Sequence, residues 1–249
     1  MTGAEIVVQV LADQGVDVIF GYSGGAILPT YDAVFRFNAK HADADNGEPM
    51  PLIVPANEQG AGFMAAGYAR AGGRVGVVMV TSGPGATNTV TPVRDCMADS
   101  TPIVVICGQV PTPAIGTDAF QEAPVSSCLG PVAKHTFLVT DPQKLEATVR
   151  TAFEIARTGR PGPVVIDLPK DVQNWKGTFR GEGLLPVPGY RQRLHAARHN
   201  VLSDAKCAKF FGMLAASRRP LIYAGGGVIN GDATDELRRL AEHLGIPVT

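Results

Sequence analysis

Residues 52–69 read LIVPANEQGAGFMAAGYA. The apolar run Leu52–Val54 predicts a short strand, and Gln59–Arg70 predicts a helix. Glu58 therefore falls near the carboxyl end of a strand and at the start of a helix, where open α/β sheets bind their ligands. A carboxylate that only complements the dipole of the first helical turn is the alternative, and position alone favours it.

Strand-like apolar runs recur on both sides of this stretch. Helical segments lie between them, among them Pro142–Arg157, and Thr2 with Glu5 forms a capping-box pattern before Ile6–Leu11. This alternation predicts an α/β fold, with a doubly wound, mainly parallel six-stranded sheet covered on both faces. The predicted strands are Val16–Phe20, Leu52–Val54, Val75–Val80, Ile103–Cys107, Thr136–Val139 and Val164–Asp167.

The composition argues against nucleic acid or a membrane as a partner. Apolar residues make up 45% of the chain, charged residues 18%, and the net charge is −1, so no basic surface is expected. No apolar run approaches the ~20 residues of a membrane span. Residues 1–5 lack the features of a signal peptide, so we expect a cytoplasmic location. No C-x-x-C pair occurs, and no metal ligands are predicted.

We expect three segments along the chain. Residues 1–175 form the first domain, residues 176–200 a Gly- and Pro-rich linker, and residues 201–249 the incomplete start of a Rossmann-like central domain. The last segment offers two strands and two helices, too little for an independent core. Its predicted elements are a first helix after Val201, a strand at Leu221–Ala224, a turn at Gly225-Gly226-Gly227, a helix at Thr234–Leu244 and a strand at Ile246–Val248.

Three glycine-rich turns are candidate ligand loops. Gly21–Ala26 and Thr81–Asn88 each follow a predicted strand, as does Gly225–Gly227. Glycine lets backbone N–H groups approach a ligand, and a following helix N-terminus favours an anion or a polar ring. Each turn is weak evidence alone, because ordinary strand–helix turns have the same composition.

Together, however, these motifs resemble the pyrimidine-binding domain of acetohydroxyacid synthase large subunits, which are thiamine-diphosphate enzymes. The resemblance covers residues 1 to about 175 and continues into the family's central domain through Gly225-Gly226-Gly227. The motifs, in chain order, are Gly21-Tyr22-x-Gly24-Gly25-Ala26, Asn57–Gly62, Ser82–Asn88, Gly108–Pro111, Gly116–Glu122, Lys134-His135, Gly159–Pro163 and Asp167–Val172.

The resemblance implies an acetolactate synthase-type transferase of branched-chain amino acid biosynthesis. Such an enzyme decarboxylates pyruvate on thiamine diphosphate and joins the product to a second 2-keto acid. Glu58 would hydrogen-bond the aminopyrimidine ring, so that the ring can take the thiazolium proton. The family also binds Mg²⁺ and FAD, and it forms a homodimer or homotetramer with a possible regulatory small subunit.

The same resemblance assigns the other site residues. The residues implied to bind thiamine diphosphate are Gly24, Gly25, Pro84 and Asn88. The residues implied to meet the substrate are Ala26, Phe120, Gln121 and Lys170, of which Gln121 and Lys170 are also candidate catalytic residues. The residues implied to contact FAD are Arg160, Gly225, Gly226 and Gly227. Loop polarity, a core aromatic at Phe120 and a cation at the helix end near Arg157 are the alternatives.

Some positions depart from the family pattern. Ser23, Asn57, Phe63 and Ala66 stand where the family usually has other residues, which leaves substrate preference open. The Gly-Asp-Gly…Asn motif that holds Mg²⁺ and diphosphate in a C-terminal domain does not occur, so the chain alone is expected to be inactive. A related thiamine-dependent decarboxylase or acetyltransferase, an FAD-free catabolic acetolactate synthase, and a non-catalytic truncated protein remain alternatives.

Overall fold

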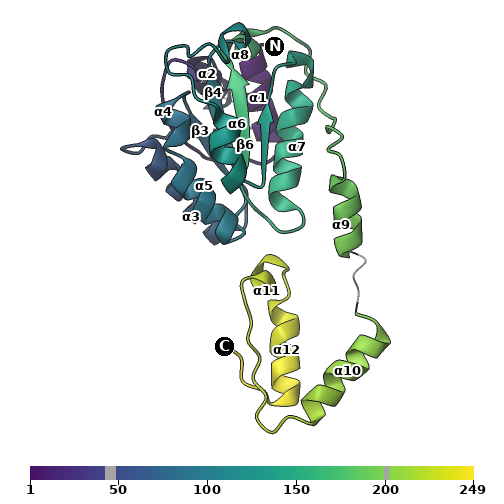
Figure 1. Ribbon diagram of the computed structural model, residues 1–249. Helices are drawn as coiled ribbons and strands as arrows, with labels where there is room; N and C mark the ends of the chain where they lie inside the picture. The colour runs from purple at the N-terminus through teal and green to yellow at the C-terminus, as the bar shows by residue number, and fades with distance from the viewer. Residues whose placement is uncertain (43–48, 199–201) are drawn as a thin grey trace. The chain divides into compact units, whose positions relative to one another are not determined.

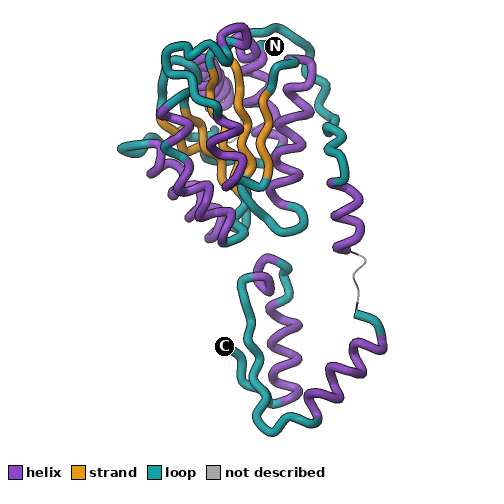
Figure 2. The backbone as a smooth tube through the Cα atoms, viewed as in Figure 1, coloured by secondary structure: helices purple, strands orange, loops and turns teal. Residues whose placement is uncertain are grey.

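The computed structural model describes residues 1–42, 49–198 and 202–249 and divides them into two compact units, Met1–Pro186 and Val187–Thr249. The first unit is built on one sheet with the strand order β2-β1-β3-β4-β6-β5 (Figures 1 and 2). All neighbouring strands are parallel. The strands are β1 (Ile19–Tyr22), β2 (Leu52–Ile53), β3 (Gly76–Val80), β4 (Ile103–Gln109), β5 (His135–Leu138) and β6 (Val164–Pro169).

Helices cover both faces of this sheet. One face carries α3, α5 and α6, and the other carries α1 and α7, with α2 and α8 packed beside α1. The predicted doubly wound, six-stranded fold is confirmed, and the sheet is parallel throughout. The helices of this unit are α1 (Gly3–Asp13), α2 (Leu28–Ala42), α3 (Glu58–Gly72), α4 (Pro84–Thr87), α5 (Val90–Ala98), α6 (Val125–Leu129), α7 (Leu145–Arg157) and α8 (Lys170–Asn174).

Local sequence explains where these elements begin. The Thr2 hydroxyl accepts from the Glu5 amide at 3.2 Å, and the Glu5 carboxylate accepts from the Thr2 amide at 2.8 Å, so the predicted capping box starts α1. The central strands β3, β4 and β6 are buried along their whole length, as expected of parallel strands covered on both faces. β1 begins at Ile19 rather than at Val16, because the Val16 amide closes the turn after α1 on the Leu11 carbonyl.

The second unit has three helices and one isolated strand contact beyond α9 (Tyr190–Arg198). They are α10 (Asp204–Ala215), α11 (Gly227–Asn230) and α12 (Thr234–Leu244). The predicted helix Thr234–Leu244 is confirmed. The two predicted strands are reduced to a parallel bridge between Ile222 and Val248, because no further strand extends the pairing within the described residues. Helix α9 also lies inside the segment 176–200 that the sequence predicts to be an irregular linker.

In the part of the chain that the structure describes, no helix is both long and apolar enough to cross a bilayer.

Candidate functional site

Glu58 is the first residue of α3 and lies at the carboxyl edge of the sheet. Asn57 caps the helix, and its side-chain oxygen accepts from the Gly60 amide at 2.8 Å. The cap fixes the direction of the first turn, and the Glu58 side chain consequently turns inward and is only 9% exposed. A carboxylate that served only the helix dipole would gain nothing from this burial, so the burial favours a ligand-directed role.

Asn88 is the hydrogen-bond partner that orients the Glu58 carboxylate. Its amide nitrogen donates to Glu58 Oε2 at 3.0 Å, across 30 residues of sequence. A Cβ atom at Gly85 would lie 3.7 Å from Glu58 Oε1, so the loop passes directly over the other oxygen. The structure thus brings together two predicted cofactor residues, Glu58 and Asn88, beneath the loop that contains Pro84.

The negative charge of Glu58 affects the pKa of the buried Tyr31 phenol. Its hydroxyl donates to the Met79 carbonyl at 3.0 Å in the buried interior. Burial, and then the negative charge of Glu58, raise the pKa of the Tyr31 phenol well above its ordinary value. The Tyr31 phenol therefore stays neutral, and the charge of Glu58 helps to keep it so.

Gly83 explains how the loop after β3 makes room for its neighbours. Its φ of 57° and ψ of −118° are accessible to glycine alone. A Cβ atom there would also lie 2.6 Å from the Gln121 carbonyl oxygen. The Gly83–Gly85 loop and the predicted substrate residue Gln121 are therefore in direct backbone contact.

The turn after β1, which contains Gly24 and Ala26, also packs against the segment after β3 that begins at Thr81. A Cβ atom at Gly24 would lie 2.5 Å from Thr81 Cβ, and the Ala26 amide donates to Thr81 Oγ1 at 3.3 Å. Gln173 holds Ala26 in place, because its side-chain amide donates to the Ala26 carbonyl at 2.7 Å. Gly25 faces open space instead. Gly24 is thus required by close packing, whereas packing places no such requirement on Gly25.

Phe120 and Gln121 project from a tightly bonded loop, residues 116–123. Phe120 is 88% exposed, so the alternative of a core aromatic is wrong. Gln121 has a φ of 60°, an uncommon conformation for a side-chain-bearing residue. The Glu122 carboxylate accepts from the Gly116 amide and, at 3.1 Å, from the Ala119 amide. These bonds lower the pKa of Glu122 below its ordinary value, and the bond from Gly116 has the largest effect.

Lys170 and Arg160 lie apart from this cluster. Lys170 opens α8 directly after β6, at the same edge as Glu58 but two strands away from β3. Arg160 precedes β6 and therefore lies at the opposite, amino edge. Its guanidinium donates to the Met97 and Ala98 carbonyls at 2.9 and 2.8 Å and to Ser100 Oγ at 2.8 Å. It caps the end of α5, not the helix end near Arg157 named in the alternative.

The three glycines predicted to contact FAD lie in the second unit, at the entry to α11. The predicted turn at Gly225, Gly226 and Gly227 is shorter than expected, because Gly226 is the N-cap residue of α11 and Gly227 is its first residue. The Gly226 carbonyl already accepts from the Asn230 amide at 3.0 Å, which places it in the helical hydrogen-bond pattern.

None of these three glycines is required by close packing. The φ of Gly226 is −56°, a value open to any residue, and added Cβ atoms at Gly225, Gly226 and Gly227 would meet nothing within 4 Å. The open backbone is compatible with the predicted role in binding FAD and does not test it.

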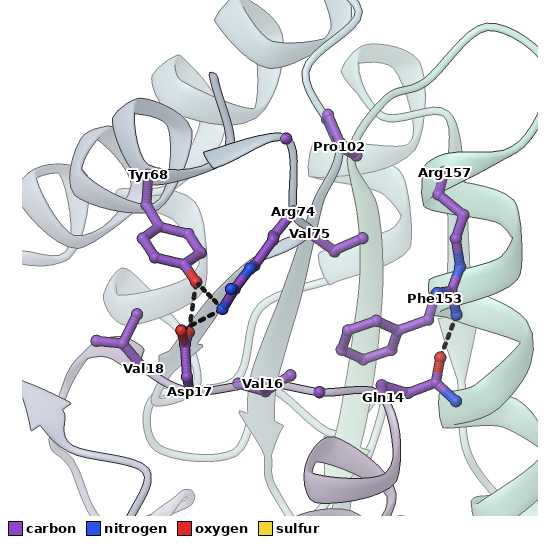
Figure 3. A pocket seen from close by; sticks show the side chains of 12 residues that line it. Gln14, Val16, Asp17, Val18, Tyr68, Arg74, Val75, Pro102, Phe153 and Arg157 are labelled. Carbon is purple, nitrogen blue, oxygen red and sulfur yellow. Dashed lines mark hydrogen bonds and ion pairs between the residues drawn. The ribbon is translucent and has the colours of Figure 1, made fainter. Parts of the chain in front are cut away.

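A pocket of about 330 Å³ lies at the amino edge of the sheet, opposite the carboxyl edge at which Glu58 lies. Its wall is formed by the residues that lead into β1, β3 and β4. Figure 3 shows Asp17, Tyr68 and Arg74 pointing toward one another, with the Asp17 carboxylate accepting from both partners. This cluster ties the start of β1 to the turn after α3, and we assign it a structural role.

Two residues that lie in the family motifs but received no role from the sequence, Gln109 and Asp167, meet in the structure. Asp167 ends the apolar run of β6 and is only 4% exposed, and Gln109 is fully buried at the end of β4. Gln109 Nε2 donates to Asp167 Oδ2 at 3.1 Å and to the Ala123 carbonyl at 3.0 Å. One signal was available, because an aspartate inside a strand that is apolar on both faces requires an explanation.

Known proteins match this chain along its whole length. The acetolactate synthase large subunit of Mycobacterium tuberculosis is 46% identical over 248 residues, which is all of this chain and 38% of the relative. The probable acetolactate synthase large subunit of Methanocaldococcus jannaschii is 45% identical over 251 residues, again all of this chain and 40% of the relative. The mitochondrial acetolactate synthase catalytic subunit of Saccharomyces cerevisiae is 42% identical over 252 residues, all of this chain and 35% of the relative.

The chain therefore spans about two fifths or less of the length of these relatives. A family profile described as the N-terminal TPP binding domain of thiamine pyrophosphate enzymes matches residues 1–127, and a profile for their central domain matches residues 207–249. On this match and on the six-stranded parallel fold, the chain belongs to the thiamine pyrophosphate enzyme family.

Proposed function

We propose that the protein carrying this chain is an acetolactate synthase catalytic subunit, which decarboxylates pyruvate and joins the product to a second 2-keto acid. The observation that carries the proposal is the buried Glu58 carboxylate, oriented by Asn88 at the carboxyl edge of a thiamine pyrophosphate enzyme domain. The identity of 42–46% to acetolactate synthases over the whole chain favours this activity over a related decarboxylase or acetyltransferase.

The residues present fit the pyrimidine ring of thiamine diphosphate. Glu58 offers a carboxyl group for a ring nitrogen, and Asn88 holds that group in place. The glycines at 24 and 83 let the backbone lie close on either side. Bound thiamine diphosphate supplies an acidic carbon and an electron sink for decarboxylation. Glu58 would hold a proton at the ring, and the burial of its side chain would keep water from the carboxyl.

The remaining parts of the assignment are proposed with less support from this chain. Diphosphate and Mg²⁺ would be held by residues outside these 249. Gln121, Phe120 and Lys170 would meet the keto acids, with Ala26 beside them, and Gly225, Gly226 and Gly227 with Arg160 would contact FAD. A homodimer or homotetramer, a regulatory small subunit and a cytoplasmic location are also proposals. Support for the substrate role comes from the exposed Phe120 and from the contact of Gln121 with Gly83.

Glu58→Gln in the full-length protein tests the proposal. An amide retains the hydrogen bond to Asn88 but cannot exchange a proton with the ring, so deuterium exchange at the thiazolium C2 should slow by ~10²–10⁴-fold. Wild type should form acetolactate from pyruvate with Mg²⁺ and thiamine diphosphate. Both rates are measured by NMR.

Glu5→Gln is the matched control, because Glu5 is also a carboxylate in the first turn of a helix, α1. Its exchange rate should equal that of wild type. Near-normal C2 exchange in Glu58→Gln would remove Glu58 from the chemistry and leave only the helix-dipole role. Normal exchange in wild type without acetolactate would point to a different reaction in the same family.

A further inference from the structure

Asp167 presents a buried carboxyl that is only half satisfied. It lies on β6 opposite Cys107 of β4, and its Oδ2 accepts from Gln109. Its Oδ1 has no hydrogen-bond partner among the described residues. A buried polar oxygen without a partner is costly and rare, and such atoms in native proteins often mark a functional constraint.

Gln109 links this carboxyl to the loop of residues 116–123. Both hydrogens of its side-chain amide are used, one on Asp167 Oδ2 and one on the Ala123 carbonyl. Its carbonyl oxygen accepts from the Val110 amide at 2.8 Å. The Asp167 carboxylate and the Ala123 carbonyl are both acceptors. The nitrogen of the Gln109 amide must therefore face these two groups, and its oxygen faces the Val110 amide.

The loop held in this way is under conformational constraint. Asp118 and Gln121 both have positive φ, at 57° and 60°, and neither is glycine. Such conformations persist only where surrounding contacts over-determine them, and they gather at functional sites. Three contacts do so here: the Gln121 backbone lies on Gly83, Glu122 binds amides inside the loop, and Ala123 is bound by Gln109.

We propose that Asp167 is a positioning residue that acts through Gln109 to hold the 116–123 loop against Gly83, so that Phe120 and Gln121 are presented at the substrate edge. The substrate part of this inference rests on the proposed function. Asp167 itself is buried, and its carboxyl accepts a hydrogen bond from Gln109. Its effect is transmitted by the bond from Gln109 to the Ala123 carbonyl.

The electrostatics agree with this link. Burial raises the pKa of Asp167 to about 7, the hydrogen bond from Gln109 opposes the rise, and repulsion from Glu122 of the loop adds to it. Gln109 and Glu122 thus both act on the Asp167 carboxyl, and Gln109 is also the residue that joins Asp167 to the loop.

The test is hydrogen exchange of the amides of Gly116, Ala119 and Glu122 in the full-length protein. Asp167→Ala should speed their exchange by about fivefold to tenfold, the effect of one hydrogen bond lost from the anchor. Asp167→Asn should keep the wild-type rate, because its amide oxygen still accepts from Gln109. This rescue by a similar side chain separates a positioning role from a general loss of packing.

Val165→Ala is the matched control, because Val165 is fully buried on the same strand and the same face. It should lower the free energy of unfolding without a selective change in the loop. If Asp167→Ala fails to fold, Gln109→Met cuts the same link from the other side and should loosen the same three amides. Unchanged loop exchange in Asp167→Ala or in Gln109→Met, or equal loosening in Val165→Ala, would overturn the proposal.

A second measurement connects the loop to catalysis. In Asp167→Ala, KM for pyruvate should rise severalfold while C2 exchange at the cofactor stays at the wild-type rate, because Glu58 is not disturbed. A fall in C2 exchange instead would show that Asp167 acts on the Glu58 site and would refute the positioning role. If the wild-type protein makes no acetolactate, the exchange of the loop amides still decides whether Asp167 holds the loop.

Discussion

Asp167→Asn should remove a pH dependence from the stability of the first unit. The folded protein raises the pKa of Asp167 from its ordinary 3.8 to about 7, chiefly by burial. Between these two values the folded state keeps a proton that the unfolded chain has released. Stability must therefore be lost as the pH rises through this window, and it changes no further above about pH 7–8. The asparagine has no proton to lose.

The magnitude follows from the size of the shift. A difference of about 3 pKa units, at 1.36 kcal/mol per unit, corresponds to roughly 4 kcal/mol in total. Over the accessible range from pH 5 to pH 8, the loss is about 2.5 kcal/mol. The Cys107 thiol on β4 has a pKa raised well above its ordinary value and stays neutral in this range, while Glu122 has a lowered pKa and stays charged. Cys128 on α6 and His135 on β5 are further ionisable side chains on the surrounding elements, and both are present in wild type and variant alike.

Urea denaturation of wild type and Asp167→Asn at several pH values measures the effect. Trp175 is the single tryptophan of these 249 residues, and its carbonyl accepts from the Gly3 amide at 2.7 Å, so its fluorescence reports on the first unit. The variant should gain about 2.5 kcal/mol relative to wild type between pH 5 and pH 8. Groups common to both proteins cancel in this difference. A difference that is flat with pH, or that falls, would refute the reasoning.

Three further substitutions test the packing at Gly83 and the proposed role of Arg160 in binding FAD. Gly83→Ala should destabilise the protein by about 1–3 kcal/mol, because its backbone conformation and its contact with Gln121 both exclude a Cβ atom. Gly67→Ala, in open space on α3, should gain up to about 1 kcal/mol, and equal effects would contradict this argument. Arg160→Ala should cost about 0.3–1 kcal/mol at the α5 end. Flavin fluorescence titration of the full-length protein then tests the FAD role, and an unchanged affinity would leave only the helix-end role.

Much of the fold could be predicted because apolar runs and helix signals are local. Buried parallel strands such as β3 and β6 are apolar at almost every position, and their short length, β-branched residues and flanking turns favour a strand over a buried helix. The start of β1 was misplaced because Val16-Asp17-Val18 has the alternating, β-branched pattern of a strand. It forms the turn out of α1 and part of the wall at the amino edge instead. Composition alone cannot distinguish these two uses.

Site residues could be predicted only where their position directly after a strand places them at the carboxyl edge of the sheet. Glu58 and Asn88 each follow a strand, and parallel topology brings such positions to one edge, so their hydrogen bond agrees with the prediction that both serve the cofactor. Arg160 is different, because the direction of a long side chain depends on carbonyls that another helix leaves unpaired. Met97 and Ala98 lie about 60 residues away in sequence, and nothing local indicates that they need a donor.

Asp167 lies in a motif that the sequence offered, but its role was missed for a related reason. A residue that binds substrate can be found by its motif, because the ligand selects the side chain directly. A residue that positions a loop is selected through its neighbour, and here the neighbour, Gln109, is itself buried and polar. The burial of both side chains would be a net cost if they served only the sheet. Their bonds end on Ala123, next to the loop positions Phe120 and Gln121. We therefore attribute the cost of burying Asp167 and Gln109 to the need to hold Phe120 and Gln121 in place.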